Sequence, residues 1–294
     1  MNPSSVAAPT RDLIPSFVRN RLALLALVTL AAIVLAAALA PVISPQNPYN
    51  LAELDILDAK LPPGATSVDG KTFVLGSDEQ GRDMLSAILY GLRISLGVGV
   101  ISTLIALTFG MAIGLAAGYA GGWVDAVIMR IVDLQLSFPS ILIALVLLAV
   151  LGQGVDKIVI ALVTVQWAYY ARTVRSTAMV EKRKEYVDAA MCLAYSKWRI
   201  VYRHILPNCL PPLIVVATVQ VAHAIALEAT LSFLGLGMPI TSPSLGLLIA
   251  NGYAHLLSGR YWMSFFPGLA LLVTIVAINL VGDHLRDVLN PRLN

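Results

Sequence analysis

Six long apolar runs divide the chain, and each has the length that a helix needs to cross a membrane. They cover residues 22–44, 94–118, 127–151, 158–178, 211–236 and 264–284. A bilayer core of about 30 Å takes roughly 20 residues of α-helix, which is about twice the length of a barrel strand. Because lipid offers no hydrogen-bond partners to the backbone, the runs predict transmembrane helices. Pro139, early in the third run, predicts a kink.

The composition agrees with a membrane protein. The 294 residues are 58% hydrophobic and 13% charged, and the mean hydropathy of +0.80 lies outside the range of soluble domains. The first run follows Arg19 and Arg21 and ends in small residues, as a secretory signal does. It is longer than a signal core and Pro41 follows it, so we expect an uncleaved anchor. The predicted fold class is an all-α polytopic membrane protein.

The basic residues predict the orientation of the six helices. An even number of spans places both termini on one side, and the excess of Lys and Arg marks that side as cytoplasmic. The prediction divides the chain into a cytoplasmic segment 1–21, an outer loop 45–91, a membrane core 92–284 and a cytoplasmic tail 285–294. Of the 20 basic residues, the cytoplasmic side receives Arg11, Arg19, Arg21, Arg130, Arg172, Arg175, Lys182, Arg183, Lys184, Lys197, Arg199, Arg203, Arg286 and Arg292.

The polar segments carry three smaller predictions. Asp69 and Gly70 are a turn pair that predicts a hairpin in the outer loop between residues 66 and 74. Arg172 and Arg175, near one end of the fourth run, are expected to reach the lipid headgroups. Cys192 and Cys209 fall on the reducing cytoplasmic side, so neither a disulfide nor a metal site is expected.

The charged cytoplasmic segment 181–207 is the part of the chain that suggests a docking function. Its composition predicts two short helices, the second of which stops near Pro207. Tyr186, Ala189, Ala190 and Leu193 fall on one face of the first helix, as in a helix that lies in the groove of a partner. A helix that lies on the membrane surface has the same spacing, and the spacing alone leaves both readings open.

This segment resembles the coupling loop, or EAA loop, of binding-protein-dependent ABC importer permeases. Asp188, Ala189 and Ala190 match its acidic-Ala-Ala core, and Leu206 with Pro207 matches the Leu-Pro pair that closes it. Ala194 stands where the family usually has Gly, and we expect the turn to survive with less backbone freedom. The resemblance implies that the ATPase-coupling residues are Glu185, Asp188, Ala189, Ala190, Ala194, Leu206 and Pro207.

Three further stretches resemble the permeases for dipeptides, oligopeptides, nickel, glutathione and opines. Residues 75–96 look like the outer-loop signature of the second permease of each pair, although Ala87 stands where Arg is common. Residues 227–237 and 279–293 match the end of the fifth helix and the carboxyl terminus. The resemblance implies the type I ABC importer permease fold. The signature residues of the outer loop are Gly76, Asp78, Gly81, Arg82 and Asp83.

The resemblance also implies a set of partners and a place in the cell. These are a homologous second permease, two cytoplasmic ATPase subunits and a periplasmic or lipid-anchored solute-binding protein, assembled in the bacterial inner membrane. The chain has no Walker A pattern, so we expect ATP and Mg to be bound by the ATPase subunits and no cofactor by this chain. We expect a non-enzymatic subunit without a nucleic-acid partner. Peptide is the first substrate choice, with nickel, glutathione and opines open.

Polar residues inside the spans are the candidates for a translocation path. Glu228 either lines the path or locks its helix to a neighbour by hydrogen bonds. His223 lies about 140° away around the same helix, so direct pairing with Glu228 is not expected. Gln166 and Tyr169 either line the path or pack. Gly110, Gly114 and Gly118 form a smooth face for close helix contact, either within this chain or with the second permease.

Two other classes of protein fit the sequence less well than an ABC permease. An ion-coupled secondary transporter often shows inverted repeats and ion sites near the midplane. The two halves of this sequence show no such repeat, and Glu228 is the one carboxylate deep in an apolar run. An intramembrane enzyme needs paired catalytic groups, whereas the four histidines are scattered. Both classes are therefore disfavoured.

Overall fold

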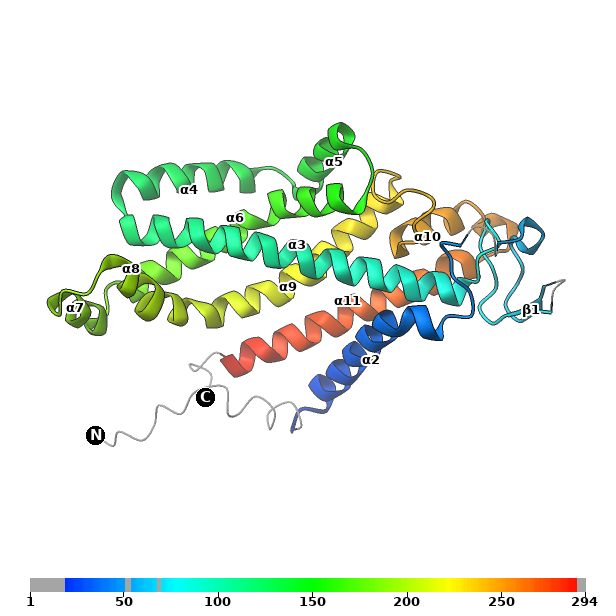
Figure 1. The fold of residues 1–294 in the computed structure, drawn as a ribbon, viewed down its shortest axis with the longest axis horizontal. Coiled ribbons are helices and arrows are strands. Elements are labelled where there is room, and N and C mark those ends of the chain that lie inside the picture. The colour runs from blue at the N-terminus through cyan, green and yellow to red at the C-terminus, as the bar shows by residue number, and fades with distance from the viewer. Residues whose placement is uncertain (1–18, 51–53, 68–69, 290–294) are drawn as a thin grey trace.

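The computed structural model describes residues 19–50, 54–67 and 70–289, and Figure 1 shows an elongated bundle of helices. Parts of the predicted terminal segments 1–21 and 285–294, and Asp69 of the predicted hairpin, lie outside the described residues. The helices are α2 (Arg21–Ile43), α3 (Met84–Ala120), α4 (Gly122–Ser137), α5 (Ser140–Leu151), α6 (Val155–Glu181), α7 (Glu185–Cys192), α8 (Lys197–Ile200), α9 (Leu206–Phe233), α10 (Leu245–Tyr253) and α11 (Trp262–Leu289).

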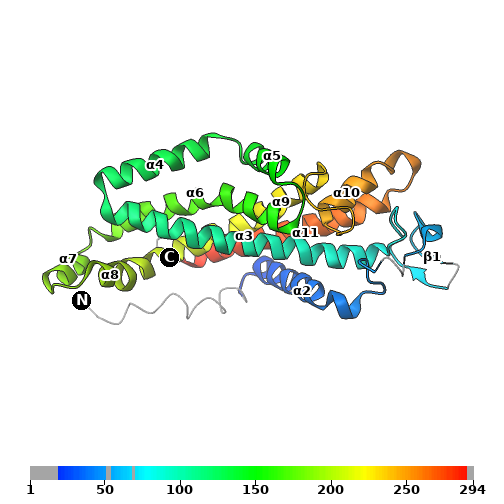
Figure 2. The ribbon, with the colours of Figure 1, turned by 45° about the horizontal axis from the view of Figure 1, so that its top comes forward.

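The long helices run along the bundle and overlap all six predicted runs, but fewer than six of them qualify as membrane spans. By length and apolar composition, α2, α3, the segment Lys197–Phe233 and α11 qualify as spans, and the pair α4 and α5 adds a fifth if it is counted as one. α6 has 27 residues but is the more polar helix, since it carries Arg172 and Arg175. α3 packs on both α6 and α9, and α11 packs between α9 and α2 (Figure 1, Figure 2).

The third predicted span is broken rather than gently kinked. α4 and α5 meet at 88° across the break between Ser137 and Ser140. Pro139 has no N–H to continue the α4 ladder, and it drives the preceding residue out of the α region. Phe138 accordingly has φ −94° and ψ 141°.

The expected stop near Pro207 is wrong. α8, the π-helical turn η4 (Val201–Ile205) and α9 form one uninterrupted helix over Lys197–Phe233. The backbone N–H of Leu206 donates to the carbonyl of Val201, which is the five-residue spacing of a π turn. Pro207 then occupies the first turn of α9, where a missing N–H removes no hydrogen bond that α9 itself needs.

The predicted glycine face joins two helices of this chain. A Cβ added to Gly110 would lie 2.4 Å from the carbonyl oxygen of Trp167, and one added to Gly114 would lie 2.5 Å from that of Ala171. A Cβ added to Gly118 would lie 3.0 Å from both the Cβ of Ala178 and the carbonyl oxygen of Arg175. These neighbours are residues of α6, so the backbones of α3 and α6 touch over two helical turns.

The expectation that Arg172 and Arg175 reach the headgroups is wrong as well. Arg172 forms an ion pair with Asp133, and Arg175 donates from Nε to Asp125 Oδ1 at 2.8 Å and from Nη2 to Asp125 Oδ2. The two pairs fasten α4 to α6 on the side of α6 away from α9 (Figure 1). A guanidinium prefers a carboxylate within reach because the bidentate pair satisfies several donors at once.

The outer loop contains the predicted hairpin, and it lies at the opposite end of the bundle from α7 (Figure 1). Strands β1 (Ala65–Thr66) and β2 (Thr72–Phe73) pair antiparallel, with Ala65 opposite Phe73. Short turns η3 (Ile56–Asp58) and η5 (Leu256–Ser258) lie in the loops. α10, which has nine residues and follows α9, was not predicted.

We predict that the α3–α6 contact does not tolerate a methyl group. Gly110→Ala places Cβ against backbone that has no room to move, and such overpacking costs about 1–3 kcal/mol. Gly97→Ala is the matched control, since Gly97 lies on α3 with nothing within 4 Å of an added Cβ. Thermal unfolding of the purified complex should show a lower midpoint for Gly110→Ala than for the wild type. The midpoint of Gly97→Ala should equal that of the wild type. Equal midpoints would contradict the close contact.

Candidate functional site: a coupling segment and an outer-loop clasp

α7 projects from one end of the bundle, beyond the ends of α3 and α6 (Figure 1). Its side chains at Glu185, Asp188 and Ala189 are exposed, as the coupling prediction requires. Met191 and Leu193 extend this surface, and Leu193 is 66% exposed. An exposed face with both acidic and apolar side chains is suited to docking on another protein.

Ala190 is the exception among the predicted contacts. It is 3% exposed and packs with Val187 against Ala178, Ile200 and Ile205. Ala190 therefore holds α7 against α6 and the α8–η4 segment instead of facing outward. Of the closing pair, Pro207 is exposed, whereas Leu206 packs partly against the same apolar cluster.

Ala194 ends α7 in the conformation for which glycine is usual. Its φ is +56°, and the N–H of Tyr195 donates to the carbonyl of Ala190 while the N–H of Ala194 donates to that of Met191. These two bonds are the Schellman motif, in which the residue after the helix is left-handed. The expected turn is thus present with Ala194 in place of Gly, at a steric cost of about 1 kcal/mol.

A polar cluster that the sequence did not reveal binds α7 to two spans. Glu181, the last residue of α6 and 6% exposed, accepts hydrogen bonds from Lys184 Nζ at 2.6 Å and from the hydroxyl of Tyr186. Asn208 of α9 donates to the same hydroxyl at 3.2 Å. Burial, together with the nearby Glu181 carboxylate, raises the pKa of Tyr186 above its ordinary value, so the hydroxyl stays a donor.

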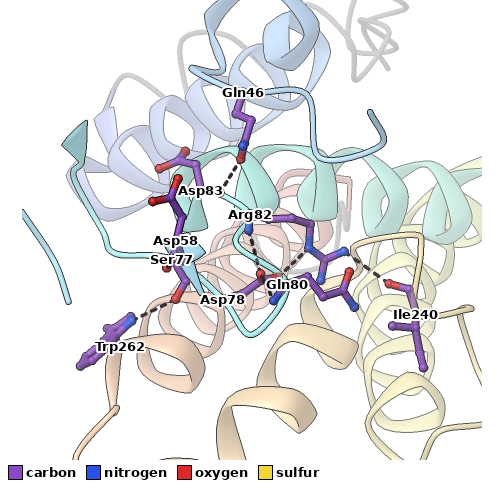
Figure 3. A network of polar contacts seen from close by, with 9 residues as sticks. All are labelled: Gln46, Asp58, Ser77, Asp78, Gln80, Arg82, Asp83, Ile240 and Trp262. Atoms are coloured by element: carbon purple, nitrogen blue, oxygen red, sulfur yellow. Dashed lines mark hydrogen bonds and ion pairs between the residues drawn. The ribbon is translucent and has the colours of Figure 1, made fainter. Parts of the chain in front are cut away.

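At the other end of the bundle, Asp78 and Arg82 form a buried ion pair (Figure 3). Arg82 Nε lies 2.5 Å from Asp78 Oδ2, and Arg82 has no exposed surface. Asp78 Oδ1 also accepts the backbone N–H groups of Gln80 and Arg82. Arg82 Nη1 reaches the carbonyl of Ile240, in the loop between α9 and α10, at 3.3 Å.

The rest of the signature ties the same loop to α2, α3 and α11. Asp83 caps α3 by accepting the N–H of Ser86 at 2.7 Å, and its own N–H donates to Gln46, just after α2, at 2.7 Å. Trp262 at the start of α11 donates from Nε1 to the carbonyl of Ser77 at 3.2 Å (Figure 3). We call residues 76–83 with these partners the outer-loop clasp.

Gly76 and Gly81 have structural reasons for their place in the signature. Both have positive φ, +81° and +76°. A Cβ on Gly81 would lie 2.1 Å from the carbonyl oxygen of Asp55, and one on Gly76 would lie 2.7 Å from that of Leu61. Both positions therefore exclude larger side chains, because the backbone has a positive φ and because a carbonyl oxygen occupies the space of a Cβ.

The four path candidates separate into two pairs. Glu228 has no exposed surface and accepts hydrogen bonds from Ser95 of α3 and Ser232, each at 2.8 Å. Gln166 is equally buried and donates to the carbonyl of Gln220 at 3.2 Å. The other two, Tyr169 and His223, are exposed on the surfaces of α6 and α9. Glu228 has the hydrogen-bonded arrangement of a lock between helices.

The fold, the coupling segment and the clasp define the membrane component of an ABC importer. The family of binding-protein-dependent transport system inner membrane components matches residues 110–294, and the N-terminal TM domain of oligopeptide transport permease C matches residues 8–63. The chain belongs to this family of inner-membrane permeases. Such a subunit is not an enzyme and works with an ATPase and a solute-binding protein.

Relatives of known name align with nearly the whole chain. A putative peptide transport system permease of Brucella abortus biovar 1 is 40% identical, covering 94% of this chain and 89% of the relative. The dipeptide transport system permease DppC of Escherichia coli K12 is 40% identical over 97% of this chain and 94% of DppC. The di/tripeptide permease DppC of Pseudomonas aeruginosa is 37% identical, with 97% and 93% covered.

A solved structure agrees with the type I permease fold. An inward-facing conformation of the MetNI methionine ABC transporter superposes with a TM-score of 0.56 and covers 70% of this chain and 98% of that chain. At 18% identity the likeness concerns the fold alone.

We predict that the clasp loses stability when Asp78 is left without its partner. Arg82→Met should lower the free energy of unfolding by about 3–5 kcal/mol, since a lone buried carboxylate is costly. The double variant Arg82→Met with Asp78→Asn should recover part of that loss. Arg93→Met, at an exposed arginine of the following helix α3, is the control. Thermal melts of the wild type, Arg82→Met, Asp78→Asn and the double variant give the coupling energy, and additive effects would contradict the buried pair.

Proposed function

We propose that this chain is one of two homologous permeases in an ATP-driven importer of di- or oligopeptides. The names of the relatives that align over 94% or more of the chain support the peptide substrate. In this proposal the chain forms half of the translocation path, and α7 docks on the pair of ATPase subunits. A periplasmic or lipid-anchored binding protein delivers the peptide to the end that carries the outer-loop clasp.

The proposed orientation places α7 and both termini in the cytoplasm. The bias of Lys and Arg toward one side supports it. The start of α2 and the end of α11 both lie toward the end of the bundle that carries α7, and the clasp lies at the other end (Figure 1). In the proposed orientation, the start of α2 and the end of α11 face the same side of the membrane as the coupling segment.

The attachment of α7 to two spans carries the proposed mechanism. Glu181 and Lys184 fasten α7 to the end of α6, and Tyr186 with Asn208 fastens it to α9. Movement of docked ATPase subunits would therefore shift both spans together. No span needs to bend locally, since the segment from Lys197 to Phe233 is one helix.

Asp188→Lys is expected to uncouple ATP hydrolysis from the binding protein. Asp188 is exposed, so the charge reversal acts on the partner surface. A lost docking contact of 1–2 kcal/mol corresponds to roughly tenfold weaker stimulation. ATP hydrolysis by the purified complex in lipid measures it, with loaded binding protein and a panel of dipeptide, oligopeptide, glutathione and Ni²⁺.

Asp156→Lys is the matched control, because this carboxylate is exposed at the opposite end of α6. It should keep full stimulation. Stimulation of Asp188→Lys at the wild-type level would refute the coupling role. Stimulation by Ni²⁺ or glutathione but by neither peptide would refute the peptide assignment while the permease assignment stands.

We place the path along the exposed polar faces of α6 and α9, where Tyr169 and His223 lie. An open cavity of about 880 Å³ is lined by residues of α6, α9 and α11. Thr177, Gln220 and Arg286 are among its polar lining residues. Gln166 and Glu228 would support the path from behind.

Thiol labelling distinguishes a residue that faces the proposed path from one that faces lipid. With Cys192 and Cys209 replaced by Ser, a cysteine at Tyr169 or His223 should react with a water-soluble reagent, and one at Gln166 should not. Leu269→Cys is the control for exposure to lipid, since Leu269 is 45% exposed on α11 but lies in an apolar setting. If positions 169 and 223 label no faster than position 269, the proposed path is wrong.

A further inference from the structure

An apolar groove of about 490 Å³ lies between the end of α3, the start of α4 and the α8–η4 segment. We call it the α3–α8 groove. Its volume is far larger than the roughly 30 Å³ share of one water molecule, and its walls offer few partners for water. Its lining includes Ala112, Ala116, Tyr119, Lys197, Trp198 and Tyr202.

Positive charge gathers where α3 and the groove end. Lys197 is exposed and lines the groove. Lys182 Nζ donates to the backbone carbonyl of Tyr119 at 2.6 Å and lies 5.1 Å from the centre of the Tyr119 ring. Tyr119 also lines the groove, so two ammonium groups flank one end of an apolar channel.

Exposed aromatic rings form the outer wall of the groove. Trp198 is 73% exposed and Tyr202 is 56% exposed. Their rings stack with centres 5.6 Å apart and an angle of 12° between their planes. Exposed Trp and Tyr at the end of a span are typical of the boundary between headgroups and acyl chains.

We propose that the α3–α8 groove binds an anionic phospholipid. One acyl chain lies along the Ala112–Ala116 wall of α3, and the phosphate accepts hydrogen bonds from Lys197 and Lys182. A channel that is apolar along its length and basic at one end matches a lipid, since it pairs apolar area with charge. The assignment to the inner leaflet rests on the proposed orientation, whereas the binding does not.

The position of the groove links the lipid to coupling. One wall is α3, which is fixed to α6 through the glycine face, and the other is the α8–η4 segment that continues into α9. A bound lipid bridges these walls next to α7. The stimulation of ATP hydrolysis should therefore depend on the headgroup charge of the surrounding lipid.

The test measures lipid that stays with the purified importer complex in nanodiscs made from equal parts of phosphatidylglycerol and phosphatidylcholine. After transfer to detergent and washing, mass spectrometry gives the phosphatidylglycerol retained per complex. Lys197→Glu should lower retention on the order of tenfold, because each basic group near the surface contributes to anionic lipid binding. Ala116→Phe should lower it by filling the groove, and Lys197→Gln provides a milder second variant.

Two control variants repeat the same Lys→Glu and Ala→Phe substitutions at positions outside the groove. Lys60→Glu changes an outer-loop lysine, and Ala126→Phe enlarges an exposed position of α4 that does not line the groove. Both should retain lipid as the wild type does. Equal retention in the Lys197 and Ala116 variants, equal retention of the two lipids, or a groove found cross-linked to another protein chain would each overturn the proposal. None of these readouts requires substrate or ATP, so a failed peptide assignment is distinguishable.

Discussion

The direct backbone contact between α3 and α6 is the constraint on which the rest of the structure depends. Lipid gives apolar side chains no reason to leave it, so helices in a membrane associate through close packing. Gly110, Gly114 and Gly118 allow that packing over two turns. This contact fixes the end of α6, and the position of Glu181 then fixes α7. The position of the coupling segment thus depends on the glycine face of α3, which has no polar side chain.

Several polar side chains in this bundle are hydrogen-bonded by a residue of another helix. Glu228 on α9 is held by Ser95 of α3, and Asp125 on α4 by Arg175 of α6. In a medium of low dielectric such bonds are strong when complete and costly when broken. A conformational change is therefore easier between groups of helices than within one. The buried lock at Glu228 favours α3 and α9 moving as a unit.

The sequence predicts features that depend on neighbouring residues and misses those that depend on distant ones. Each of the six apolar runs falls on a helix, although only four or five of these qualify as spans, and the Asp188-Ala189-Ala190 motif located α7. Partners 39 and 50 residues away, Asp133 and Asp125, redirect Arg172 and Arg175 from lipid to ion pairs. Spacing placed Ala190 on the docking face, whereas packing against Ile200 and Ile205 turns it inward. No local pattern marks α10, because its nine residues complete the clasp region through contacts with α9 and α11.

The continuity of the helix through Pro207 has a mechanical consequence. Two helices joined by a flexible turn would absorb a displacement of α7, whereas a continuous helix passes it on. The π turn makes the continuity possible because its wider ring places Pro207 in the first turn of α9 without breaking a required bond. Val201 and Tyr202 of this turn line the α3–α8 groove, and Asn208 follows in the next turn, so a displacement of α7 reaches α9 through η4.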